Sequence, residues 1–187
     1  MKTAVVTIES MSPYSSSRRH ETPRENEEEH DAYENRTWRE KCTTDEEGFW
    51  VIPRAGFQQS LQTAAGQITQ KVKGKGAKQW TAYFLAGVIV ENDLRLPIKK
   101  QEVKGIRLPC SATGQRGRGS QVFRWFPIIE QWGGEVVYHI LDDMITQEVF
   151  VNVLTRSLGL VGVGRFRGEK GGFNGRAKIV KIKWLKN

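Results

Sequence analysis

Hydrophobic and polar residues follow regular periods along much of the chain. Residues 2–9 alternate, with Val6 and Ile8 on one face, which predicts a β-strand. This strand should end before Pro13, because proline has no backbone N–H to give to a sheet. Further along, apolar residues recur at the spacing of one helix face: Phe57, Leu61, Ala64, Ala65 and Ile68. That spacing predicts a helix packed on a sheet.

The same patterns predict the remaining elements of a folded domain. A second helix is expected at residues 146–158, with Thr146 as its N-cap. Further strands are expected at residues 49–52, 86–90, 121–127, 134–141 and 176–185. A strand, a helix, two central strands, a helix and a closing strand form the split βαβ pattern of a ferredoxin-like α+β fold. We therefore expect residues 1–187 to form a single domain with insertions at about residues 10–47 and 91–120.

The first insertion is expected to hold a polar loop and an acidic helix. Residues 10–21 are polar, and the sequence Thr22-Pro23-Arg24-Glu25 is typical of a helix start, which predicts a helix from about residue 23 to residue 41. Only Tyr33 and Trp38 are expected to be buried, so this helix should lie on the surface or project from it. The second insertion, 91–120, is rich in Gly, Pro and basic residues and is expected to be irregular.

Charge is distributed unevenly along the chain. The 187 residues hold 29 Lys and Arg against 21 Asp and Glu, a net charge of +8. Residues 1–50 contain 7 basic and 12 acidic side chains (net −5), which leaves 22 basic and 9 acidic (net +13) for residues 51–187. The basic part is therefore where a polyanion should bind.

Several protein classes are not indicated by this sequence. No stretch approaches the roughly 18 to 20 apolar residues that a membrane span needs, and no signal peptide pattern is present, so we expect a cytoplasmic protein. Cys42 and Cys110 have no CxxC spacing and no neighbouring His ligands, so neither a disulfide framework nor a zinc site is predicted. We expect no metal and no cofactor.

The segment 159–176 carries the clearest candidate chemistry, because it combines glycine, basic and aromatic residues. Glycines allow a backbone to approach a phosphate, basic side chains neutralise it, and aromatic rings can stack on bases. The GxxxxGK[ST] pattern of a nucleotide-binding loop is absent. The candidate nucleic-acid contacts here are Arg165, Phe166, Arg167, Lys170, Phe173 and Arg176. The alternative is a mobile loop with solvated arginines.

Two further basic clusters lie beside aromatic residues. The first is followed by Trp80 and Tyr83, and it consists of Lys71, Lys73, Lys75 and Lys78. The second lies beside Phe123 and Trp125, and it consists of Arg116, Arg118 and Arg124. Both mixtures are typical of a positively charged surface next to a stacking platform. The alternative for each is a charged loop beside core aromatics.

Catalytic patterns are weak in this sequence. His20 follows the first strand and is a candidate general base, but an exposed histidine without a partner is the alternative. Asp142 and Asp143 are a candidate Mg²⁺ site, although such a pair between a strand and a helix is more often a turn or cap. No GxSxG or HExxH motif occurs. We therefore expect a protein without catalytic activity.

Two resemblances bear on these expectations. The Gly-rich loop before the last strand of a ferredoxin-like core resembles that of the RAMP superfamily, especially the backbone subunits of CRISPR effector complexes, which polymerise along guide RNA. A second similarity, to uncharacterised proteins of phages and prophages, covers nearly the whole chain. It rests on four motifs: Ser12-Pro13-Tyr14-Ser15-Ser16-Ser17-Arg18, Arg36-Thr37-Trp38-Arg39-Glu40, Leu96-Pro97-Ile98-Lys99-Lys100 and Gly162-Val163-Gly164-Arg165-Phe166-Arg167.

Together the residues and the resemblances predict a nucleic-acid-binding protein. The expected partners are single-stranded DNA or RNA, or an RNA–DNA duplex, bound along the basic Gly-rich face. The acidic helix beside a basic body suggests a head-to-tail contact with a second copy, and so a homo-oligomer or filament. Two alternatives stay open. One is a phage inhibitor that imitates a subunit of a host defence complex, and the other is a RAMP-like endoribonuclease that uses His20.

Overall fold

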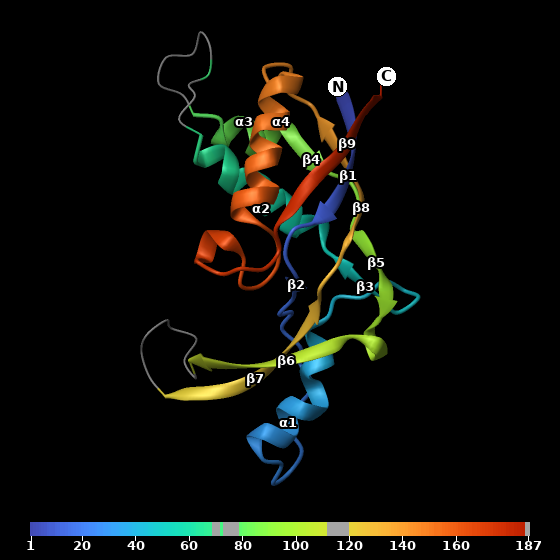
Figure 1. The fold of residues 1–187 in the computed structure, drawn as a ribbon, viewed down its shortest axis with the longest axis vertical. Helices are drawn as coiled ribbons and strands as arrows, with labels where there is room; N and C mark the ends of the chain where they lie inside the picture. Colours follow the sequence, from blue (N-terminus) through green and yellow to red (C-terminus); the bar gives the residue numbers. More distant parts are fainter. Residues whose placement is uncertain (69–71, 73–78, 112–119, 186–187) are drawn as a thin grey trace.

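The main sheet of the protein has four antiparallel strands. The computed structural model describes residues 1–68, 72, 79–111 and 120–185. The strands lie in the order β4-β8-β1-β9, and each neighbouring pair is antiparallel. Their bounds are β1 (Lys2–Ser10), β4 (Val88–Val90), β8 (Gly133–Ile140) and β9 (Ala177–Leu185). Figure 1 shows β1 and β9 side by side, with the two chain ends close together.

Two helices cover one face of this sheet. These are α2 (Arg54–Gly66) and α4 (Gln147–Arg156), and α4 continues into a short π-helix, η3 (Ser157–Val161). Ala4, Val6 and Ile8 of β1 point into the core between sheet and helices and are buried, as their alternation predicts. Strand order and helix positions match the ferredoxin-like plan. The predicted α+β fold class is therefore confirmed.

A short helix changes the way the chain enters the sheet. Helix α3 (Thr81–Gly87) comes directly before β4, so the strand predicted at residues 86–90 begins later, at Val88. Strand β4 corresponds to the second strand along the chain of a ferredoxin-like fold. It lies at the edge of the main sheet and pairs with β8. The strand predicted at residues 121–127 exists as β7 (Gln121–Ile129), but it belongs to another sheet.

The prediction that residues 91–120 are irregular is wrong for the part of this segment that the structure describes. It contains β5 (Leu94–Lys99), a single turn η2 (Lys100–Glu102) and β6 (Lys104–Ser111). Strand β5 pairs with β3 (Phe49–Ile52), while β6 pairs with β7 in the sheet β2-β7-β6. Pro97 and Pro109 obscured these strands in the sequence. Both lie in strands with a neighbour on one side only, where a missing N–H is tolerated.

The acidic arm, which we define as residues 21–41, contains less helix than predicted. Helix α1 spans His30–Thr37 and a 3-10 turn η1 spans Trp38–Lys41. The expected start at residue 23 is wrong, because the Glu28 carboxylate accepts hydrogen bonds from the Glu25 backbone N–H and from Arg36. These bonds hold residues 25–28 in a turn. Figure 1 shows α1 beyond the β6–β7 hairpin, at the far end of the molecule from the two termini.

A buried ion pair attaches the arm to β7. Besides Trp38, the arm buries Glu34, Thr37 and Lys41, which the sequence analysis did not expect. The Lys41 ammonium lies 2.7 Å from the Glu34 carboxylate and donates to the Trp125 carbonyl at 2.7 Å. The Trp125 N–H in turn donates to Glu34 at 3.3 Å. Together the two side chains satisfy the Trp125 backbone on the side of β7 opposite to β6, where the pairing with β2 at Ile128 and Ile129 does not reach.

Amide side chains likewise form hydrogen bonds with unpaired backbone groups of β4 and β8. Gln58 of α2 donates to the Val88 carbonyl at 2.9 Å and accepts from the Val90 N–H at 3.0 Å, so it covers the outer edge of β4. Asn92 donates to the Glu135 carbonyl and accepts from the Val137 N–H of β8 beyond the end of β4. Each amide takes the place of a neighbouring strand and satisfies backbone groups that would otherwise lack partners.

The buried pair leads to a stability prediction. Lys41→Met leaves the Glu34 carboxylate buried without a counter-charge, so we expect a loss of about 3–5 kcal/mol in the free energy of unfolding. Urea denaturation followed by circular dichroism measures this loss. The double variant Glu34→Leu/Lys41→Met should lose clearly less than the sum of the two single losses. Additive losses would show that the two side chains do not stabilise each other.

Candidate nucleic-acid interface

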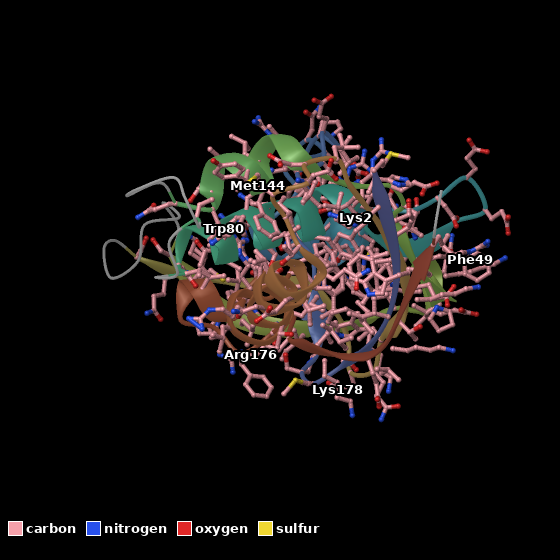
Figure 2. All side chains as sticks on the ribbon, turned by 90° about the horizontal axis from the view of Figure 1, so that it is seen from above. Lys2, Phe49, Trp80, Met144, Arg176 and Lys178 are labelled. Carbon is pink, nitrogen blue, oxygen red and sulfur yellow. The ribbon has the colours of Figure 1, made fainter. Side chains whose placement is uncertain are left out.

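The loop of residues 162–176, here called the Gly-rich loop, docks against the segment that follows β1. The Gly175 N–H donates to the Pro13 carbonyl at 2.7 Å, and the Arg165 N–H donates to the Ser15 carbonyl at 2.8 Å. The loop also bonds to itself, since the Val163 N–H donates to the Gly175 carbonyl at 2.9 Å. Figure 2 labels Arg176, where the loop passes into β9. Backbone hydrogen bonds therefore fix the loop to residues 13–15.

Close packing within the protein requires two of the loop's glycines. Gly164 and Gly175 have φ angles of +78° and +77°, a region that residues with a side chain rarely adopt. A Cβ at Gly175 would overlap the Val163 carbonyl, and one at Gly164 would overlap Tyr14 and the Ser15 carbonyl. These glycines allow the loop to fit against its own chain, which is a different reason from the approach to a phosphate that the sequence suggested.

A cleft of about 990 Å³ opens beside the loop. Its walls come from the Gly-rich loop, from residues 14–18, from the start of α2 and from the end of β6. Among the described residues that line it, four are basic and none is Asp, Glu or His. The four are Arg18, Arg165, Arg167 and Lys170. The cleft wall is thus positively charged.

Arg165 is held in a defined position on this wall. Its guanidinium carbon lies 4.5 Å from the centre of the Phe126 ring and 4.7 Å from that of Phe166, within the range of a cation–π contact. Its Nη1 donates to the Ser17 hydroxyl at 3.2 Å. Within the described part of the chain no carboxylate pairs with Arg165. Arg165 therefore offers an uncompensated positive charge at a fixed place.

Arg167 and Lys170 share one carboxylate. Glu169 lies 2.8 Å from an Arg167 nitrogen and 3.0 Å from the Lys170 ammonium. The hydrogen bond from Lys170, followed by that from Arg167, holds the pKa of Glu169 below its usual range. Two cations thus surround one anion.

The two phenylalanines of the loop differ in their surroundings. Phe166 packs edge-to-face on Phe126, with ring centres 5.2 Å apart and an angle of 84° between the planes. Phe173 is 63% exposed and does not line the cleft. Of the two rings proposed for base stacking, Phe173 has the free surface, and Phe166 supports Arg165.

Arg176 lies at the base of the loop and not on the cleft wall. Its backbone N–H donates to the Ser12 hydroxyl at 2.9 Å, and its carbonyl accepts from the Met11 N–H at 2.7 Å. Four of the six residues proposed in the Gly-rich loop therefore line the cleft, while Phe173 and Arg176 do not.

The two other basic clusters fall mostly beyond the described residues. Lys71, Lys73, Lys75, Lys78, Arg116 and Arg118 all lie outside the described ranges. Of the aromatic neighbours, Trp80 is buried against Phe84, whereas Phe123 is 52% exposed beneath the Arg107 guanidinium. Phe123 is thus an accessible ring on the hairpin.

Sequence reasoning missed the contribution of residues 14–18. They were expected to lie in a polar loop, yet Tyr14 and Ser15 form the short strand β2, and both are buried together with Ser16. Arg18 and Ser17 line the cleft beside Arg165. The available signal was an aromatic residue within a serine run that ends in arginine.

The candidate catalytic residues lie elsewhere. The His20 ring packs 6.0 Å from Tyr33 of the arm and does not line the cleft. Asp142 accepts the Met144 N–H at 2.8 Å, as a turn residue does, and Asp143 lies 3.8 Å from the Lys2 ammonium. Among the described residues, no group of three or more His, Cys, Asp or Glu is placed to hold a metal. In the same residues no helix is long and apolar enough to span a membrane.

Two proteins are named here among the solved structures to which the chain is similar. One is the crystal structure of Cmr6 from Pyrococcus furiosus, with 14% identity, a TM-score of 0.48, and coverage of 96% of this chain and 99% of that one. The other is a Cas6 product complex, with 17% identity, a TM-score of 0.32, and coverage of 96% of this chain and 51% of that one. No family model and no curated protein matches the sequence.

The docking of the loop leads to a second prediction. Gly175→Ala introduces a Cβ that overlaps the Val163 carbonyl at a positive φ, so we expect a loss of at least about 1–3 kcal/mol in stability. Gly159→Ala is the matched control, because a Cβ there meets no atom within 4 Å. Thermal unfolding of both variants measures the difference. Equal melting temperatures would mean that the loop does not need this packing.

Proposed function

We propose that the protein binds single-stranded nucleic acid, or an RNA–DNA duplex, in the cleft beside the Gly-rich loop. The observation that carries this proposal is a cleft whose described lining has four basic and no acidic side chains, and in which Arg165 has a fixed position and no described carboxylate as a partner. Phosphate groups provide the charge that such a wall attracts, and counterion release favours their binding.

The basic residues contribute in different ways. Arg165 and Arg18 meet the first phosphates, because no carboxylate pairs with either of them in the described residues. Arg167 and Lys170 bind a phosphate only when it displaces the Glu169 carboxylate that now lies between them. Phe173, exposed on the same loop, supplies a ring for stacking on a base.

We propose binding without catalysis. A general acid or base must lie within hydrogen-bond reach of the group that it protonates or deprotonates. In the part of the cleft lining that the structure describes there is no histidine or carboxylate, and His20 lies against the arm. The ferredoxin-like order of the main sheet, with the Gly-rich loop before its last strand, supports a RAMP-type nucleic-acid-binding subunit.

Assembly with further copies is also part of the proposal, although the acidic arm has limited charge to offer. Much of its acidity is compensated within the chain, since Glu28 pairs with Arg36, Asp31 with Arg107 and Glu40 with Lys100. Among the described residues, three exposed arm carboxylates have no ion pair: Glu21, Glu27 and Glu29. A head-to-tail contact through the arm would rest on these three.

Binding should depend on salt and on the two arginines without a carboxylate partner. For a fluorescent 20-mer of uridine or thymidine, we expect the logarithm of the association constant to fall with the logarithm of salt concentration, with a slope of roughly −0.7 per neutralised phosphate. Arg18→Ala/Arg165→Ala should weaken binding at least about tenfold at moderate salt and lower that slope by about 1.4. Fluorescence anisotropy measures both.

Lys183→Ala, which removes an exposed charge from β9, is the control and should bind like wild type. Arg165→Lys separates charge from geometry, because lysine keeps the charge but loses the planar guanidinium that rests on the rings. A wild-type association constant that does not change with salt concentration would contradict the phosphate contacts.

Glu169 gives a prediction of opposite sign. Glu169→Gln keeps the size of the side chain but removes the anion that competes for Arg167 and Lys170. We therefore expect tighter binding of the same oligonucleotides and a steeper salt dependence, by about one phosphate. Glu135→Gln, an exposed carboxylate on β8, is the matched control. An affinity unchanged by Glu169→Gln would place the phosphates away from Arg167 and Lys170.

A further inference from the structure

Strand β9 has an open edge, unlike β4 and the part of β7 that lies beside the acidic arm. Side chains close β4 through Gln58 and β7 through Glu34 and Lys41. Strand β9 is the opposite edge of the main sheet and spans nine residues, Ala177–Leu185. Apart from its pairing with β1, no hydrogen bond from the described residues reaches the backbone of residues 178–185. Open edges of this length can pair with another strand.

A β-bulge organises the side chains along this edge. Thr7 pairs with Lys181 while Ile8 pairs with Ile179, so Val180 is an extra residue in β9. The extra residue shifts the alternation, and Lys178, Lys181 and Lys183 come to lie on the face of the sheet opposite to α2 and α4. Without the bulge, Lys178 and Lys181 would lie on opposite faces of the sheet.

The two faces of β9 therefore have different chemistry. On the core face, Ile182 and Trp184 are half-buried, and the Trp184 ring packs 5.7 Å from Phe150. On the other face, Lys178 is paired with Glu9 at 3.1 Å. Lys181 and Lys183 are exposed, and among the described residues no carboxylate pairs with them. The edge thus combines free backbone groups, an apolar face and two uncompensated cations.

We propose that β9 binds an extended segment of a partner protein as a fifth strand of the main sheet, and that this segment alternates apolar and acidic residues. Main-chain hydrogen bonds supply affinity in this mode of recognition, and alternate side chains supply specificity. Apolar side chains of the added strand would lie beside Ile182 and Trp184. Acidic ones two residues apart, about 6.6 Å along the strand, would face Lys181 and Lys183.

Charge also selects against another partner for this edge. Two copies of β9 paired edge to edge would bring their lysines close together, and like charges across a strand pair are unfavourable. The two lysines thus disfavour pairing with a second copy of β9 and favour pairing with an acidic strand. This inference does not depend on the proposed function of the cleft.

The test uses full-length protein and labelled peptides of eight residues. The first peptide alternates valine with glutamate, the second replaces glutamate with lysine, and the third is the first with every other backbone nitrogen methylated. We expect the acidic peptide to bind at least tenfold tighter than the other two by fluorescence anisotropy. Its binding should also slow hydrogen exchange at the amides of residues 178–185.

The variant Lys181→Glu/Lys183→Glu should reverse the preference between the first two peptides. Both lysines are exposed, so their replacement should change stability by no more than about 0.5 kcal/mol, which circular dichroism checks. Equal binding of all three peptides, or exchange protection outside β9, would overturn the proposal. So would displacement of the acidic peptide by a thymidine 20-mer from the wild type but not from Arg18→Ala/Arg165→Ala, since both ligands would then share the cleft.

Discussion

The hydrogen bonds between residues 11–15 and the Gly-rich loop fix the position of the groups in the cleft. Met11 and Ser12 both donate to the Arg176 carbonyl, Gly175 donates to Pro13, and Arg165 donates to Ser15. The two segments are far apart in the sequence, and the pairing of β1 with β9 brings them together. Tyr14 anchors the first segment between Trp50 and Trp132, with ring centres 5.3 Å and 5.9 Å away. The cleft therefore depends on the central strands of the main sheet.

This arrangement explains why the basic side chains of the cleft differ in whether a carboxylate pairs with them. Arg165 follows Gly164, which packs on Tyr14, and so its side chain turns to the Phe126 ring and to Ser17. Among the described residues, no carboxylate pairs with Arg165 there. Arg167 follows two residues later, where Glu169 folds back onto it. Neighbouring basic residues on one loop thus differ in free charge, which a count of basic residues along the sequence does not reveal.

The periodic parts of the chain were predictable from the sequence, and the contacts over long distances were not. The apolar stripe from Phe57 to Ile68 predicted α2, and the alternation in residues 2–9 predicted β1, because both patterns depend on local geometry. The basic residues of the Gly-rich loop were also visible. Arg18 was missed because only the fold brings it beside Arg165. The length of α1 was misjudged because Arg36 draws Glu28 into a turn, a competition that helix-start rules do not include.

The buried pair of Glu34 and Lys41 acts on the cleft through the hairpin. An apolar pair of similar size would avoid the desolvation of two charges, but it could not satisfy the N–H and carbonyl of Trp125, which both side chains contact. Trp125 stacks on Trp38 of the arm, and the ring of the next residue, Phe126, lies under the Arg165 guanidinium. The Lys41 ammonium lies 4.8 Å from the centre of the same Phe126 ring that Arg165 approaches. The arm therefore sets the position of the Phe126 ring that supports Arg165. An apolar pair in place of Glu34 and Lys41 could not hold this part of β7 through the Trp125 backbone.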